Sequence, residues 1–115
     1  MMSLKKVLVL DQELLHENKQ RESTVSLIPA SSAQGAINRI SSDPMIDGAV
    51  LDVGCSDRLA FEAITALRTL KPHVPIVALS EDVFDAGEAI RHGADAFLQK
   101  PVRADDVLRL MERLF

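Results

Sequence analysis

Short apolar runs alternate with amphipathic segments along almost the whole chain. The apolar runs are rich in Val, Ile and Leu and end at polar residues, proline or glycine, which is typical of strands buried on both faces of a parallel sheet. Each run is followed by a segment whose apolar residues recur at helical spacing. The predicted strands are residues 7–10, 25–28, 49–51, 76–79 and 96–98.

Three helices are predicted in the first part of the chain, and the second and third begin at recognisable capping residues. The first, over residues 14–21, is mostly polar and is therefore the weakest. Ser31 or Ser32 suits the N-cap of the second helix, and Asp57 suits that of the third, which runs to about Leu70. The apolar positions predicted to face the core are Leu14 and Leu15 in the first helix, Ala33, Ala36, Ile37 and Ile40 in the second, and Ala60, Ile64 and Leu67 in the third.

A glycine and a pair of acidic residues delimit the last two predicted helices. Gly93 is expected to end the fourth helix in a left-handed conformation. Asp105 and Asp106 open the fifth helix, where the helix dipole favours negative charge. The residues predicted to share one face are Val83, Ala86, Gly87 and Ile90 in the fourth helix, and Val107, Leu110, Met111 and Leu114 in the fifth.

This alternation of strands and helices predicts an α/β fold. Because crossovers between parallel strands are long and right-handed, we expect a flavodoxin-like three-layer sandwich, with a five-stranded parallel sheet of order 2-1-3-4-5 and helices on both faces. Pro29 lacks an N–H donor and suits an edge position for the second strand. The length indicates one domain over residues 1–115, with residues 1–4 interpreted as partly an expression scar.

Composition narrows the possible functions. The formal net charge of −4 argues against a nucleic-acid surface. No apolar run approaches the length of about 18 residues of a membrane span, and no secretion signal is evident. The lone Cys55 excludes an internal disulfide, fits a reducing, cytoplasmic location and is interpreted as inert packing. His16, His73 and His92 lack metal-like spacing and are predicted to lie on the surface.

Chemistry-bearing residues stand at the ends of four predicted strands. In open parallel sheets, ligands bind beyond the carboxyl ends of the strands, so these residues are expected to meet. Two nearby carboxylates favour a divalent cation such as magnesium, and a carboxylate beside a lysine can accept a phosphoryl group. Asp52, which ends the third strand, is the predicted nucleophile. The four residues are Asp11, Asp52, Ser80 and Lys100.

Four segments of the chain resemble the receiver domain of bacterial two-component response regulators, including the chemotaxis regulators. Residues 7–11 resemble the first strand with its acidic pocket, and residues 50–52 resemble the strand that ends in the phosphoacceptor. Residues 77–80 resemble the strand that ends in a switch Ser or Thr. Residues 93–101 resemble the segment that ends in Lys-Pro, with an aromatic residue three positions before the lysine.

The resemblance implies a role for each site residue. Asp52 would accept a phosphoryl group from a histidine kinase or phosphotransfer partner. Magnesium or manganese would be held by Asp11, Asp52 and the backbone carbonyl of Gly54. Ser80 and Lys100 would bind the phosphoryl oxygens. The other implied features are Phe97 as a second switch residue and a cis Lys100–Pro101 bond.

The resemblance also implies partners. The fourth helix, fifth strand and fifth helix would contact an output domain or form a homodimer. The protein would be a signalling module rather than an enzyme, with self-catalysed phosphoryl transfer and self-dephosphorylation as its only reactions. It would make no direct contact with nucleic acid or a membrane.

The chain departs from the family pattern at four places. Gln12 replaces the second acid and would be a weak metal ligand, while Glu13 is expected to point elsewhere. Glu81 stands where a small residue usually follows the switch hydroxyl, and residues 55–56 are Cys-Ser in place of an apolar residue and proline. The first helix is expected to be about one turn short, which affects kinase docking.

Structural roles compete with these functional ones. Asp52 could cap a turn, Asp11 and Ser80 could cap helices, Lys100 could be a solvated surface residue, and Phe97 could be ordinary core. The first alternative function is a pseudo-receiver that serves as a phosphorylation-independent docking or dimerisation domain. A flavin or nucleotide binder of the same fold is the second, although no glycine-rich loop follows any predicted strand.

Overall fold

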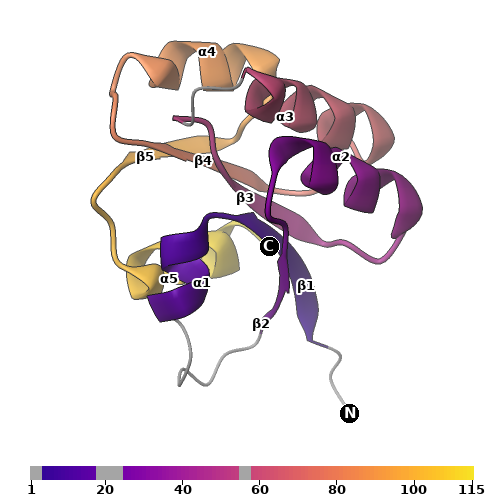
Figure 1. The fold of residues 1–115 in the computed structure, drawn as a ribbon. Coiled ribbons are helices and arrows are strands. Elements are labelled where there is room, and N and C mark those ends of the chain that lie inside the picture. Colours follow the sequence, from indigo (N-terminus) through magenta and orange to yellow (C-terminus); the bar gives the residue numbers. More distant parts are fainter. Residues whose placement is uncertain (1–3, 18–24, 55–57) are drawn as a thin grey trace.

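A parallel sheet runs through the centre of the molecule (Figure 1). The computed structural model describes residues 4–17, 25–54 and 58–115. Within them, five strands lie in the order β2-β1-β3-β4-β5, which confirms the predicted flavodoxin-like topology and the edge position of β2. The strands are β1 (Lys5–Leu10), β2 (Val25–Pro29), β3 (Gly48–Asp52), β4 (Ile76–Ser80) and β5 (Ala96–Gln99).

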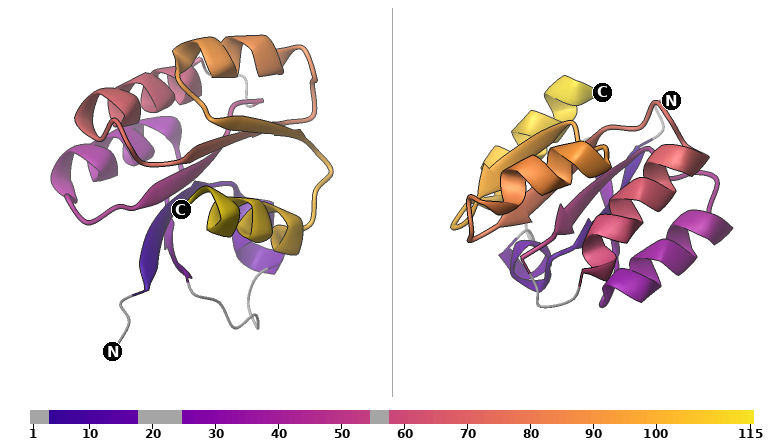
Figure 2. Two further views of the ribbon diagram at one scale, coloured as in Figure 1. Left: turned by 180° about the vertical axis from the view of Figure 1, so that it is seen from behind. Right: turned by 90° about the horizontal axis from the view of Figure 1, so that it is seen from above.

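Helices cover both faces of this sheet, as predicted. Figures 1 and 2 show α1 and α5 on one face and α2, α3 and α4 on the other. The longest, α3, has 12 residues, and among the described residues no helix is long and apolar enough to cross a membrane. The helices are α1 (Gln12–Glu17), α2 (Ala33–Ser42), α3 (Leu59–Leu70), α4 (Asp85–His92) and α5 (Ala104–Leu114).

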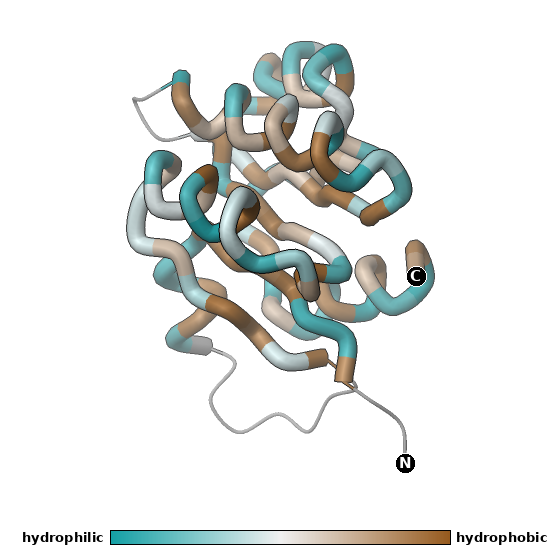
Figure 3. The backbone as a smooth tube through the Cα atoms, turned by 90° about the vertical axis from the view of Figure 1, so that its right-hand side faces the viewer, coloured by the Kyte–Doolittle hydropathy of each residue, from teal (hydrophilic) through white to brown (hydrophobic). Residues whose placement is uncertain are grey.

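The strand residues supply two cores because side chains alternate across a sheet. Val7 and Val9 pack with the residues of α1 and α5, whereas Leu8 and Leu10 pack with those of α2, α3 and α4. Figure 3 shows the hydrophobic colouring concentrated on the central strands. Burial on both faces explains why the strands are continuous apolar runs.

Two predicted helix-end residues are confirmed, whereas α1 begins at Gln12, two residues before the predicted start. The Ser32 hydroxyl accepts a hydrogen bond of 2.9 Å from the Gly35 N–H, so Ser32 rather than Ser31 is the N-cap of α2. Gly93 follows α4 with φ of 120°, a conformation that favours glycine. The predicted N-cap Asp57 lies outside the described residues, as does the predicted end of the first helix near residue 21.

The predicted inward face of α4 is wrong. Val83 precedes the helix, and it and Ile90 are about half exposed, whereas Ala89 is buried. Ala89 packs in the core formed with α2 and α3, and on the same helix the Glu88 carboxylate pairs with Arg58, which directly precedes α3.

The His92 side chain is 32% exposed, in keeping with the predicted surface position, and its Nδ1 lies 2.9 Å from the Thr65 hydroxyl oxygen of α3. One further burial prediction fails. Leu114 is 37% exposed because it is the last residue of α5, and Leu108 is buried in that helix instead. Periodicity located both helices but not the orientation of every side chain.

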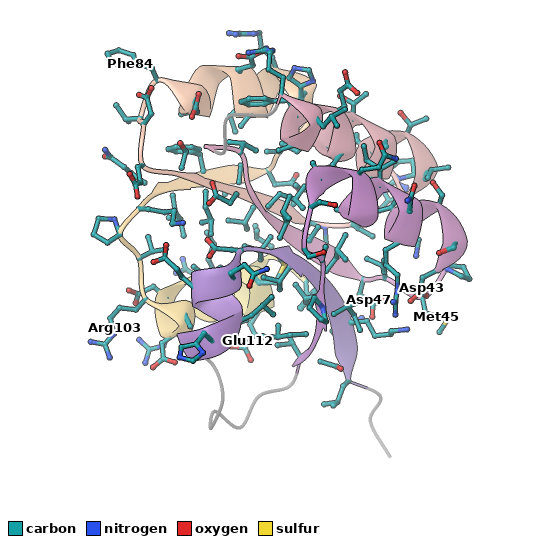
Figure 4. The ribbon with its side chains drawn as sticks, in the orientation of Figure 1. Asp43, Met45, Asp47, Phe84, Arg103 and Glu112 are labelled. Carbon is teal, nitrogen blue, oxygen red and sulfur yellow. The ribbon has the colours of Figure 1, made fainter. Side chains whose placement is uncertain are left out.

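A carboxylate cluster stabilises the amino-terminal end of the strands, opposite the predicted site (Figure 4). Asp43 accepts hydrogen bonds from the Met45 N–H at 2.9 Å and from Lys6 Nζ at 3.0 Å. These two bonds, in that order, are the largest causes that lower the pKa of Asp43 from 3.8 to about 2. Asp47 adds a hydrogen bond from the Lys6 backbone N–H.

We predict that Asp43 makes folding stability depend on pH. Because its pKa is lower in the folded state, its contribution is present above about pH 4 and is lost as the pH falls through about 2. Asp43→Asn should therefore be less stable than wild type near neutral pH, and the difference should vanish near pH 2. Urea unfolding at several pH values measures it, with Asp106→Asn, an exposed carboxylate in α5, as the control. A difference that does not change with pH would contradict this assignment.

Candidate functional site

The carboxyl ends of four strands bring the predicted site residues together. In the sheet register, Leu10 lies beside Leu51, and Ser80 lies beside Gln99. The next residue along each of β1, β3 and β5 is therefore placed at the same edge of the sheet. The polar residues at this edge are Asp11, Asp52, Ser80 and Lys100.

Lys100 joins the acidic residues of this edge. Its Nζ lies 3.0 Å from Asp52 Oδ2 and 3.1 Å from Asp11 Oδ2. The Lys100 side chain is 12% exposed and that of Asp11 only 4%, so solvent screens their ion pair weakly. The prediction that these side chains gather is confirmed, and a fully solvated Lys100 is ruled out.

Each carboxylate also stabilises its own segment of backbone. Asp11 Oδ1 accepts a hydrogen bond of 3.2 Å from the Leu14 N–H at the start of α1. Asp52 Oδ1 accepts one of 2.8 Å from the Gly54 N–H in the turn after β3. The structural roles considered for Asp11 and Asp52 are therefore real, and they occupy one oxygen of each carboxylate while the other faces Lys100.

The charges around Lys100 favour its protonated form. Burial on its own lowers the pKa of the Lys100 ammonium. Hydrogen bonds to Asp52 and Asp11, with the Coulomb attraction of both, outweigh that effect and raise the pKa above its ordinary value. Lys100 is thus a permanent positive charge at this edge, suited to bind the anionic oxygens of a phosphoryl group.

Ser80 is fully buried, and its hydroxyl is engaged by the segment that leads into α4. Its Oγ accepts a hydrogen bond of 3.0 Å from the Asp82 N–H and donates one of 2.6 Å to Asp85 Oδ2. The Ser80 hydroxyl thus binds residues just before and within the first turn of α4, but it is not the cap of that helix, whose N-cap is Phe84 without a side-chain cap hydrogen bond. Ser80 nevertheless lines the same pocket as Asp52 and Lys100.

This pocket, which we call the Asp52 pocket, has a volume of about 380 Å³. Acidic side chains outnumber basic ones on its wall, so it favours a cation together with any incoming phosphoryl group. A second pocket, of about 290 Å³, touches Asp11 and Asp52 from the side of α2 and includes Gln12. The residues that line the Asp52 pocket are Glu13, Asp52, Gly54, Ser80, Glu81, Asp82 and Lys100.

Sequence reasoning missed two contacts of the site. The expectation that Glu13 points elsewhere is wrong, because its Oε1 lies 3.8 Å from Lys100 Nζ and it lines the Asp52 pocket. The second missed contact is the hydrogen bond from the Ser80 hydroxyl to Asp85, a residue that the sequence did not indicate as part of the site. Acidic residues in the first turn of a helix are common for dipole reasons alone, so no feature of the sequence indicated that Asp85 contacts Ser80 at the end of β4.

The donor set is compatible with magnesium. Among the described residues, no group of three or more acidic, His or Cys side chains is placed to hold a metal alone. Magnesium usually takes one or two carboxylates and keeps several waters. Asp11 and Asp52 already share one cation, the Lys100 ammonium, at about 3 Å, so their oxygens are spaced for a shared positive charge.

Three further predictions concern Phe97, the Lys100–Pro101 bond and residues 55–56. Phe97 is partly buried against the core that includes α2, α3 and α4, and its predicted role as a switch stays a prediction. The Lys100–Pro101 bond is cis, as expected. The predictions for Cys55 and Ser56 lie outside the described residues.

The comparisons with known proteins point to one family. The family model of the response regulator receiver domain matches residues 9–112. No curated protein matches the chain in sequence.

Several solved structures have the same fold. A response regulator receiver protein from Sinorhizobium medicae is 24% identical, with a TM-score of 0.79 over 97% of this chain and 94% of that one. The chemotaxis response regulator CheY4 of Vibrio cholerae is 21% identical, with the same TM-score over 97% and 99%. A Burkholderia pseudomallei response regulator with a phosphorylated aspartic acid, a calcium ion and citrate is 22% identical, with a TM-score of 0.76 over 93% and 66%.

We predict that Lys100→Met destabilises the protein by about 2 kcal/mol, because the two carboxylates lose their shared hydrogen-bonded cation. Magnesium should then stabilise the variant more than wild type, since a bound cation replaces the lost charge. Urea unfolding with and without magnesium chloride measures both effects. Lys71→Met, which removes an ammonium bound to the Ile46 carbonyl at the other end of the sheet, is the control. An equal magnesium effect in both variants would refute the prediction.

We also predict that Gly54→Ala disturbs Ser80. A Cβ at position 54 would lie 2.5 Å from Ser80 Oγ and 3.3 Å from Asp52 Oδ1, so the hydroxyl would have to rotate away. The expected cost is about 1–2 kcal/mol of folding stability. In a Ser80→Ala background the same change should cost clearly less, and chemical denaturation of the four proteins measures this coupling. Additive effects would show that Gly54 and Ser80 are independent.

Proposed function

We propose, because the chain belongs to the family of response regulator receiver domains, that it is a phosphorylation-switched receiver module whose phosphoacceptor is Asp52. The observation that carries the proposal is Lys100 Nζ within 3.1 Å of both Asp52 and Asp11. Each of these side chains ends a different strand, and their meeting needs a specific tertiary arrangement. A capping role alone would not require the shared lysine.

The proposed reaction is transfer of a phosphoryl group to the Asp52 carboxylate. A carboxylate oxygen attacks the phosphorus, and the bond from phosphorus to a histidine nitrogen of a kinase or phosphotransfer protein breaks. The histidine keeps the electron pair of that bond and leaves as an imidazole. Lys100 would turn from the carboxylates toward the phosphoryl oxygens, and its raised pKa keeps it charged throughout.

Asp11, Asp52 and the Gly54 carbonyl are the proposed metal ligands. Magnesium, when bound, would neutralise charge on the transferred group. Gln12 replaces an acid and brings no charge, while Glu13 lines the Asp52 pocket and adds one negative charge to it. This net acidity supports a strict requirement for a divalent cation, because without one the pocket would repel an incoming phosphoryl group.

The proposed output follows from the same edge of the sheet. A phosphoryl group on Asp52 would draw the Ser80 hydroxyl toward it, and Phe97 would respond behind it on β5. The surface formed by α4, β5 and α5 would then contact an output domain or a second copy of the chain. The kinase or phosphotransfer protein would meet the module in the cytoplasm.

A pseudo-receiver is the second candidate, and particular residues favour it. Gln12 lowers the expected affinity for the metal. Glu81 is exposed, lines the Asp52 pocket and adds negative charge beside the phosphorylation site. In this alternative the same surface would serve as a docking or dimerisation face that does not depend on phosphorylation.

We predict that acetyl phosphate with magnesium adds one phosphoryl group to the protein. Intact-mass spectrometry should detect the adduct in wild type, and Asp52→Asn should lose it. Omitting magnesium should abolish it, because the acidic pocket then lacks a neutralising cation. Glu62→Gln, an exposed acid in the first turn of α3, is the matched control and should behave as wild type.

Replacing the atypical residues separates the two candidates. Gln12→Asp and Glu81→Ala should each increase the extent of phosphorylation if the module is a working receiver. An adduct that appears only in these variants, and never in wild type, would support the pseudo-receiver. No adduct in any of them would refute Asp52 as the phosphoacceptor.

A further inference from the structure

The hydroxyl of Ser80 has its hydrogen-bonding capacity committed to the start of α4. A hydroxyl carries a single donor hydrogen. In this structure that hydrogen is directed at Asp85 Oδ2, 2.6 Å away, and the oxygen accepts from the Asp82 N–H at 3.0 Å. Ser80 is fully buried, whereas Asp85 is partly exposed and Asp82 is exposed.

The α4 helix buries few of its residues, and polar contacts supplement its packing. Of its residues, all of which are described, Ala89 is the one that is buried. Glu88 pairs with Arg58, and His92 contacts Thr65. Phe84, just before the helix, is 88% exposed and points away from the body of the molecule (Figure 4). With little apolar burial, a few hydrogen bonds decide where α4 lies.

We propose that Asp85 is a latch that holds the switch in its resting state. Its carboxylate and a phosphoryl group on Asp52 compete for the same hydrogen of Ser80, so the two bonds exclude each other. Asp85 is a positioning residue, since it acts through Ser80 and does not line the Asp52 pocket. The inference rests on the proposed phosphorylation of Asp52. It identifies Asp85 as the residue that sets how much binding free energy the phosphoryl group must supply to release the Ser80 hydroxyl.

The same bond links the site to α4. Asp85 lies in the first turn of α4, so breaking its bond to Ser80 removes a tether between the end of β4 and the helix. Phosphorylation would release α4 at the moment Ser80 turns to the phosphoryl group. Conversely, an intact latch reduces the fraction of molecules that can bind the phosphoryl group well and weakens its apparent binding by that fraction.

Gly54 provides the space in which the latched hydroxyl lies. A Cβ at that position would come within 2.5 Å of Ser80 Oγ. The resting position of the hydroxyl is therefore directly beside the turn that follows the phosphoacceptor.

The test uses beryllium fluoride with magnesium, a phosphoryl mimic whose fluorine atoms accept hydrogen bonds. Isothermal titration calorimetry measures its binding to the full chain, which contains no Trp or Tyr for a fluorescence signal. Asp85→Ala should bind the mimic about tenfold more tightly than wild type, because a charge-assisted hydrogen bond no longer competes. Asp85→Asn, which keeps a weaker acceptor of the same shape, should show a smaller gain.

Two comparisons separate the latch from simple charge removal. Glu88→Gln removes one negative charge from the same helix, outside the lining of the Asp52 pocket, while keeping a side-chain oxygen that can accept from Arg58. It should change binding less than Asp85→Asn does. In a Ser80→Ala background, Asp85→Ala should have no effect, because the competing hydroxyl is absent.

The outcomes distinguish this inference from the proposed function. If wild type does not bind the mimic, the phosphorylation proposal fails and the latch fails with it. If wild type binds it but Asp85→Ala binds no more tightly, only the latch is refuted. An equal gain from Asp85→Ala with and without the Ser80 hydroxyl would also refute the latch, since the effect would then be electrostatic.

Discussion

The Lys100 ammonium is the interaction on which the arrangement of this site depends. A parallel sheet places the ends of β1 and β3 side by side, and here both ends carry a carboxylate. Asp11 and Asp52 would repel each other in a buried setting if no cation lay between them. Lys100 reaches them from the far edge of the sheet, two strands beyond β3, and so ties three strand ends into one charged cluster.

The same cluster shows how structural and chemical roles share a residue. One oxygen of Asp11 and one of Asp52 bind backbone N–H groups, while the other oxygen of each faces Lys100. The local bonds orient each carboxylate, so that it would not have to be ordered on binding the proposed cation or phosphoryl group. A capping role is thus part of the preorganisation of the site rather than an alternative to it.

The α4 helix stands apart from the other helices of its layer. Its partner α3 buries five residues, among them Ile64 and Leu67, and is fixed by apolar packing. In α4 the burial of Ala89 is supplemented by polar bonds to α3 and to Ser80. Apolar burial resists displacement over a whole face, whereas a hydrogen bond can be exchanged for another. Polar attachment is therefore consistent with the proposed displacement of α4.

The sequence by itself determined the strands, their order, the edge position of β2 and the four strand-end residues, because periodicity and chain connectivity are local or topological properties. It did not determine the orientation of α4, the position of Glu13 beside Lys100 or the bond from Ser80 to Asp85. Each of these depends on which side chains meet across separate elements, and no spacing along the chain encodes such a meeting. Only the tertiary structure decided them, since the packing of α4 against α3 and of α1 against α5 sets those distances.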